Sequence, residues 1–174
     1  MRALEEPMRA VLAGLALLLV STPAFAQQPA PASGRTMVSA ADVAAMMAKA
    51  KVDRKDNQAM LAQSMIRLDP YNVSLEYRVA VANAAVHETE AELFYVIDGS
   101  ATLVTGGKLK NETRTNAANL SGSGIDGGQS RHVAKGDFIM VPEGQPHWFS
   151  QIDGTVVLMS LHLPHAPKPA TTAP

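Results

Sequence analysis

The spacing of hydrophobic residues changes once along the chain, from a helical period to a strand period. Val43, Met46, Met47 and Ala50 fall on one stripe at helical spacing, and Ser39 precedes them as an N-cap residue. Further along, apolar and polar residues alternate with a period of two, which is typical of β-strands. The expected strands lie within residues 59–68, 73–81, 93–97, 101–105, 138–141, 147–151 and 156–163. One short N-terminal helix followed by many short strands predicts an all-β barrel or sandwich.

Turn-forming residues are expected to separate these strands. Asp69-Pro70-Tyr71-Asn72 is typical of a turn, and Asp98-Gly99 predicts a hairpin between residues 93–97 and 101–105. Residues 106–130 are rich in Gly, Asn, Ser and Thr. Because long structureless loops are uncommon in compact domains, we interpret this region as a partly ordered loop at the rim of the barrel.

The two ends of the chain have a different composition from its middle. Arg2 and Arg9 precede an apolar run, residues 10–20, and a small-residue site ends at Ala26. This pattern predicts a signal peptide at residues 1–26 and a periplasmic or secreted protein. Residues 27–56 would form a leader and the N-terminal helix, and residues 57–163 the β-barrel domain. The Pro/Ala/Thr-rich residues 164–174 are expected to form a disordered tail.

Charge and cysteine content exclude several classes of function. The chain has 15 basic and 16 acidic residues, giving a net charge of −1. Such a balance favours neither nucleic acid nor an anionic membrane surface, so we expect no membrane association after signal removal. The chain has no cysteine, which excludes disulfides, thiolate metal sites and cysteine nucleophiles. A small molecule is the expected partner.

Two sequence motifs suggest a metal site. Gly136, Pro142, Gly144 and His147 have the spacing Gly-x5-Pro-x-Gly-x2-His, which resembles the second motif of the cupins. Upstream, Glu92 is followed at the correct distance by Gly99, and His87 stands five residues before Glu92. This segment resembles the second half of the first cupin motif, His-x-His-x4-Glu-x6-Gly.

The resemblance implies a fold and a cofactor. Cupins are jelly-roll-like β-barrels, often dimeric, so we expect a cupin-type jelly-roll β-barrel that forms a homodimer. The resemblance also implies that His87, Glu92 and His147 are ligands of a divalent metal ion. Two histidines and a carboxylate leave coordination positions open and suit Fe(II), Mn, Ni or Zn.

The chain departs from the family pattern at one ligand position. The first histidine of the motif is replaced by Ala85, and the asparagine that follows the second motif is replaced by Gln151. His132 is a candidate for the missing ligand, whereas His162 and His165 are interpreted as structural or exposed. A barrel that has lost its metal is the alternative.

These observations predict a metal-dependent enzyme of the oxygenase, lyase or isomerase type that acts on a small organic molecule. The catalytic residues and the substrate are not identified by the sequence. The family spans many reactions, so the fold does not select one of them. The alternative is a non-catalytic cupin that binds a small ligand with a weak or lost metal site.

Overall fold

A computed structural model describes residues 35–165 of the chain. The predicted signal peptide, residues 27–34 of the leader and residues 166–174 of the tail lie outside this range. None of the helices in the described part has the length and apolar character needed to cross a membrane.

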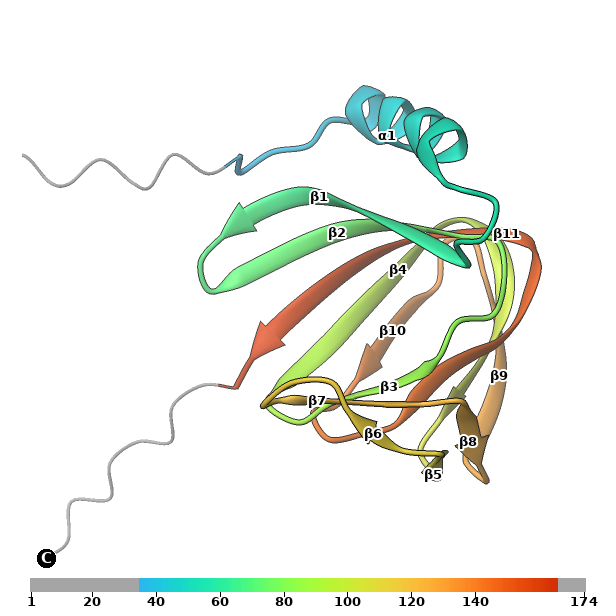
Figure 1. Ribbon diagram of the computed structural model, residues 1–174. Helices are drawn as coiled ribbons and strands as arrows, with labels where there is room; N and C mark the ends of the chain where they lie inside the picture. The colour runs from blue at the N-terminus through green and yellow to red at the C-terminus, as the bar shows by residue number, and fades with distance from the viewer. Residues whose placement is uncertain (1–34, 166–174) are drawn as a thin grey trace, which may run out of the picture. The chain divides into compact units, whose positions relative to one another are not determined.

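The described residues form one helix and eleven strands, as predicted for an all-β fold with a short N-terminal helix (Figure 1). The elements are α1 (Ala40–Asp53), β1 (Met60–Leu68), β2 (Tyr71–Arg78), β3 (Ala84–His87), β4 (Glu90–Thr105), β5 (Lys108–Lys110), β6 (Thr113–Arg114), β7 (Asn119–Gly122), β8 (Gly124–Asp126), β9 (Gln129–Ala134), β10 (Phe138–Val141) and β11 (His147–Pro164).

Strands β4 and β11 are the central strands of the fold because each is long enough to take part in two sheet layers. They pair antiparallel along most of their length. The first half of β4 pairs with β10, and its second half pairs with β9. The C-terminal half of β11 pairs with β2, whereas its first residue pairs with β3. The fold therefore has two sheet layers that share these two bent strands.

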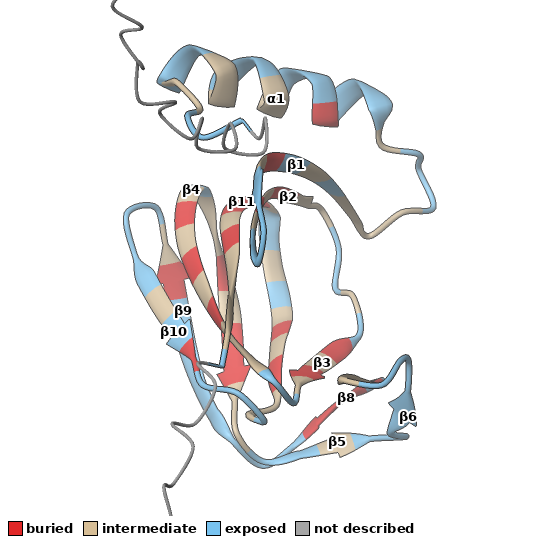
Figure 2. Ribbon diagram, turned by 90° about the vertical axis from the view of Figure 1, so that its left-hand side faces the viewer, coloured by how far each residue is buried: buried red, intermediate tan, exposed pale blue. Residues whose placement is uncertain are grey.

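Alternation along the shared strands separates an inner from an outer face (Figure 2). Fully buried Phe94, Val96 and Leu158 form the inner core together with Leu103 and Phe149. The alternate residues of β4 and β11, such as Ile97 and Met159, face outward and pack against helix α1.

Helix α1 begins at the predicted N-cap. The Ser39 side chain accepts a hydrogen bond from the Asp42 amide, and the Asp42 carboxylate accepts one from the Ser39 amide, which completes a capping box. Val43, Met46 and Met47 pack on the outer face of the sheet. The methionine stripe is thus part of a packing layer.

The Asp98-Gly99 pair does not form the predicted hairpin. Residues 93–97 and 101–105 belong to the single strand β4, and β11 is likewise one strand where two were predicted. Gly99 lies at a bend of β4 with φ +78°, opposite an irregular stretch of β11 between Ile152 and Val156. A bend and a hairpin require the same left-handed glycine, so the local sequence did not distinguish them.

The predicted rim loop, residues 106–130, is ordered into strands β5 to β8 and the start of β9. Strand β7 pairs with all of β3, and Ile125 is buried against Ala84 and Val104. Trp148 packs against this same cluster. Residues 106–130 therefore extend one sheet layer through β3 and do not form a loop at the rim of the barrel.

The last strand runs slightly past the expected end of the barrel domain. Strand β11 extends to Pro164, and the His165 amide donates a hydrogen bond to the Thr89 carbonyl, so the ordered fold ends after residue 163. Among the described residues, the strand pairing does not close into a complete ring, because β1 and β6 each have only one partner strand.

Replacing Gly99 tests the bend on which both layers depend. A Cβ atom at this position would lie 1.9 Å from the Thr155 carbonyl oxygen. We expect Gly99→Ala to lower the free energy of unfolding by about 3 kcal/mol, because it adds a clash with backbone to the cost of a positive φ. Gly154→Ala is the matched control, since Gly154 has φ +75° but no atom within 4 Å of the added Cβ. Chemical denaturation should show a loss of about 1 kcal/mol for the control. Equal losses of stability in Gly99→Ala and Gly154→Ala would contradict the clash with the Thr155 carbonyl as the cause.

Candidate metal centre

The three predicted ligands converge at one end of the fold, although they belong to three different strands. His87 is the last residue of β3, Glu92 lies near the start of β4, and His147 is the first residue of β11. His147 pairs with Ala85 across β3 and β11, which sets it beside His87 two residues further along. The turn at residues 88–89 then returns the chain so that Glu92 faces both histidines.

The Glu92 carboxylate lies at the centre of the group. Its Oε2 atom is 3.3 Å from Nε2 of His87 and 3.1 Å from Nε2 of His147. Glu92 is only 3% exposed, and His147 is also buried. The structure therefore brings together the three side chains that the motifs selected, while metal binding by them stays a prediction.

A third histidine reaches the same carboxylate, and the sequence analysis did not identify it. His162 lies directly opposite Glu92 in the pairing of β11 with β4, and its Nε2 atom is 3.4 Å from Oε1 of Glu92. Ligand atoms of His87, Glu92 and His162 all lie within 4.8 Å of one another. The interpretation of His162 as structural or exposed is corrected: the side chain belongs to the centre.

One sequence signal for His162 was available. In a strand, residues two apart share a face, so Leu158, Ser160 and His162 point the same way. Leu158 and Ser160 are fully buried. The strand period alone thus placed His162 on the same face as Leu158 and Ser160, and the structure shows that this face is the inner one.

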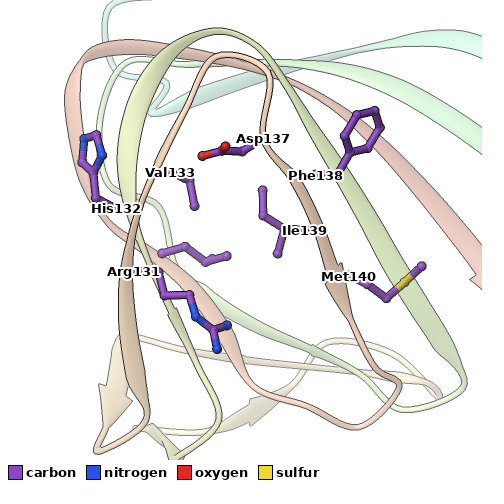
Figure 3. A pocket seen from close by; sticks show the side chains of 8 residues that line it. Arg131, His132, Val133, Asp137, Phe138, Ile139 and Met140 are labelled. Atoms are coloured by element: carbon purple, nitrogen blue, oxygen red, sulfur yellow. The ribbon is translucent and has the colours of Figure 1, made fainter.

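His132, the candidate for the missing ligand, lies elsewhere. It is on β9, is 64% exposed, and its Nε2 atom is 3.3 Å from Asp153. It borders a pocket of about 360 Å³ between β9 and β10. Figure 3 shows Val133 and Ile139 directed into that pocket, with His132 to one side. Ala85, on β3, has no side-chain nitrogen that could bind a metal at the first motif position. His162, on β11, approaches the centre from a different strand.

Each of the three imidazoles is oriented by a hydrogen bond at Nδ1. Nδ1 of His87 is 2.7 Å from Oδ1 of Asn119, and Nδ1 of His162 is 3.0 Å from a carboxylate oxygen of Glu90. Nδ1 of His147 faces the Gln145 carbonyl at 3.3 Å. All three partners accept hydrogen bonds, so they favour a proton on Nδ1 and leave Nε2 as the atom that would bind a metal ion. This arrangement is typical of histidines that bind metal.

The electrostatics of the centre favour a cation. Burial alone would raise the pKa of Glu92, but hydrogen bonds from His147, His87 and Ser160 outweigh it and hold that pKa far below its usual value. Burial would lower the pKa of His87, but the contacts with Glu92 and Asn119 outweigh this effect and raise it. Glu92 is therefore ionised and requires a positive partner.

The donor set fits a divalent transition metal. Three imidazole nitrogens and one carboxylate oxygen are ligands of Fe(II), Mn, Ni and Zn, and no thiolate is involved. Below the centre lie apolar side chains, with the Phe94 ring 6.0 Å from the His147 ring and the Phe149 ring beyond it. One side of the centre is thus closed by the core, and His87 and His162 are its more exposed members.

Comparisons with known proteins give structural neighbours but no sequence relatives. No protein-family model matches the chain, and no curated protein matches it. The cupin domain of Cnp3 from Schizosaccharomyces pombe aligns with a TM-score of 0.46 at 12% identity, over 66% of this chain and 72% of its own. KdgF from Halomonas sp. aligns with a TM-score of 0.48 at 13% identity, over 65% of this chain and 86% of its own.

A cupin superfamily protein from Desulfitobacterium hafniense aligns with a TM-score of 0.45 at 15% identity, over 65% of this chain and 84% of its own. All three TM-scores lie below 0.5, so the assignment of the fold rests on the chain's own strands and motifs. Within this chain, both motifs lie at the same open end of the two-layered sheet and bring His87, Glu92 and His147 together, as the resemblance implied. The chain therefore has a cupin-type fold.

Proposed function

We propose that this protein is a metal-dependent enzyme that acts on a small organic molecule. His87, Glu92, His147 and His162 would hold one divalent ion. The observation that carries the proposal is the convergence of three imidazole Nε2 atoms, each with Nδ1 held by an oxygen, on one buried carboxylate.

The surrounding residues have defined tasks in this proposal. Ser160 donates a hydrogen bond to Oε1 of Glu92 and fixes the plane of the carboxylate. Asn119, Glu90 and the Gln145 carbonyl orient the imidazoles. Phe94 and Phe149 keep water from the inner side of the centre.

A divalent ion bound here would polarise a substrate oxygen as a Lewis acid or, as Fe(II), support oxygen chemistry. Four protein ligands leave one or two positions of a five- or six-coordinate ion for substrate. Oxygenase, lyase and isomerase reactions are all compatible with this arrangement.

A non-catalytic binding protein is the second candidate, and one observation favours it. Glu90 is the nearest further carboxylate along β4, but it is engaged with His162. Among residues 35–165 we therefore identify no free general base beside the centre.

Turnover separates the two candidates. We expect the Fe(II)-loaded protein to consume oxygen, or to convert a member of a panel of small hydroxylated and carboxylated compounds without consuming it. Oxygen-electrode and NMR assays would measure these two outcomes. Saturable binding of a compound that is never converted would favour the binding protein.

Export and assembly belong to the proposal as well. The signal-like residues 1–26 support a periplasmic or secreted protein, and the absence of cysteine is compatible with either location. Homodimer formation rests on the family resemblance alone.

Metal analysis of histidine variants tests the centre directly. We expect the purified wild type to hold close to one divalent ion per chain after reconstitution. His87→Ala, His147→Ala and His162→Ala should each lower metal affinity at least tenfold, because each removes a ligand. His132→Ala is the matched control and should retain the wild-type content, since His132 lies outside the centre. Elemental analysis with a competing chelator would measure both.

Two outcomes would contradict this assignment. A folded wild type that holds no metal after reconstitution would remove the proposed function. Normal metal content in His162→Ala would leave the three motif residues as ligands and exclude His162.

Asn119 provides a test of how the His87 imidazole is oriented. Asn119→Ala removes the acceptor at Nδ1 of His87, so we expect metal affinity to fall by about 10- to 100-fold while the fold is retained. Asn116→Ala is the control, because its side chain accepts a hydrogen bond only from the Ala118 amide on the neighbouring turn. A competitive metal indicator would measure both variants. Equal effects would show that the turn, rather than the histidine contact, matters.

A further inference from the structure

A row of polar side chains leads away from the metal centre across neighbouring strands. Glu92 of β4 is paired with His162 of β11, His162 with Asn72 of β2, and Asn72 with Arg67 of β1. Residues directly opposite one another in antiparallel strands project from the same face of the sheet. Arg67 and Asn72 therefore lie on the face that carries the centre, although no motif includes them.

Asn72 has an unused hydrogen-bond acceptor. Its Oδ1 atom is buried and has no hydrogen-bond partner among the described residues. A buried polar atom without a partner is costly, and such atoms in native structures are commonly satisfied by water or by a ligand. Because Asn72 is the direct neighbour of His162, a hydroxyl group of a molecule bound at the centre is a suitable donor.

Arg67 ends the row with a positive charge. It is exposed and forms no ion pair within residues 35–165. Two strand spacings, about 10 Å, separate its backbone from that of His162. Figure 1 shows the β1–β2 hairpin on the same side of the fold as the C-terminal end of β11. A guanidinium there can form a bidentate contact with a carboxylate.

The charges along the row favour an anion once the metal is bound. Glu90 and Glu92 contribute two negative charges, a divalent ion contributes two positive charges, and Arg67 contributes one more, which leaves a net charge of +1. Of the carboxylates further out, Glu88 is paired with Arg114 and Glu143 with His165, whereas Asp69 in the β1–β2 turn is exposed to solvent. A monoanionic ligand would balance the remaining charge.

We propose that the centre binds a small hydroxycarboxylate, with its carboxylate at Arg67, a hydroxyl donating to Oδ1 of Asn72, and a distal oxygen at the metal. This inference rests on the proposed function, because it requires an occupied metal centre. It adds a substrate class and two positioning residues on β1 and β2.

Calorimetric titration of the Mn²⁺-loaded protein with three six-carbon probes tests the inference. Gluconate carries both the carboxylate and the hydroxyls, sorbitol only the hydroxyls, and hexanoate only the carboxylate. We expect gluconate to bind at least tenfold more tightly than either of the others. Manganese content is measured on the same samples, so loss of the metal is distinguished from loss of the ligand.

Variants then assign the two contacts. Arg67→Gln should weaken gluconate binding at least tenfold and Arg67→Lys less, whereas Arg131→Gln, which removes an exposed arginine on β9, should leave binding unchanged. Asn72→Ala should weaken gluconate binding and leave hexanoate binding unaltered. All four variants should keep their manganese.

The inference is overturned if metal-loaded protein binds sorbitol as tightly as gluconate, binds none of the probes, or is insensitive to Arg67→Gln. A protein that never loads manganese would instead remove the proposed function on which the inference depends.

Discussion

The ionised Glu92 carboxylate, almost fully withdrawn from water, is the constraint on which the rest of the site depends. Placing a charge in an apolar interior is strongly unfavourable unless positive charge and hydrogen-bond donors surround it. This chain surrounds Glu92 with His87, His147 and His162 and a hydroxyl from Ser160. The same environment that stabilises the carboxylate is one that a divalent cation would stabilise further. Stability of the fold and affinity for a cation thus have a common origin.

The long pairing of β4 with β11 holds these groups in register. It places His162 and Ser160 against Glu92 and Phe94, and the bend at Gly99 lets the same two strands continue into the second layer, where β3 and β7 contribute His87 and its partner Asn119. The centre therefore lies where the two layers share their strands. Residues on both layers are fixed relative to each other by backbone hydrogen bonds rather than by flexible loops.

Local patterns predicted the fold class and three members of the centre, because turn chemistry and short motifs act over a few residues. Gly136 to His147 and His87 to Gly99 are segments of this kind. His162 was not recognised because its role depends on pairing with Glu90 and Glu92, and it is 72 residues from Glu90. The Asp98-Gly99 bend was taken for a hairpin since both need the same backbone conformation. Residues 106–130 form strands by pairing with one another and with β3 and β4, and no alternation of apolar and polar residues in that stretch predicted them.

The last strand, β11, supplies three of the groups that contact Glu92, namely His147, Ser160 and His162, while β3 supplies His87. A chain that ended at β10 would contain two of the four proposed metal ligands, His87 and Glu92, and only one of the two strands that join the layers. A complete centre is therefore a property of the finished chain. Without β11, Glu92 would lack three of its four polar contacts, so the centre requires the pairing of the chain's last strand with β4.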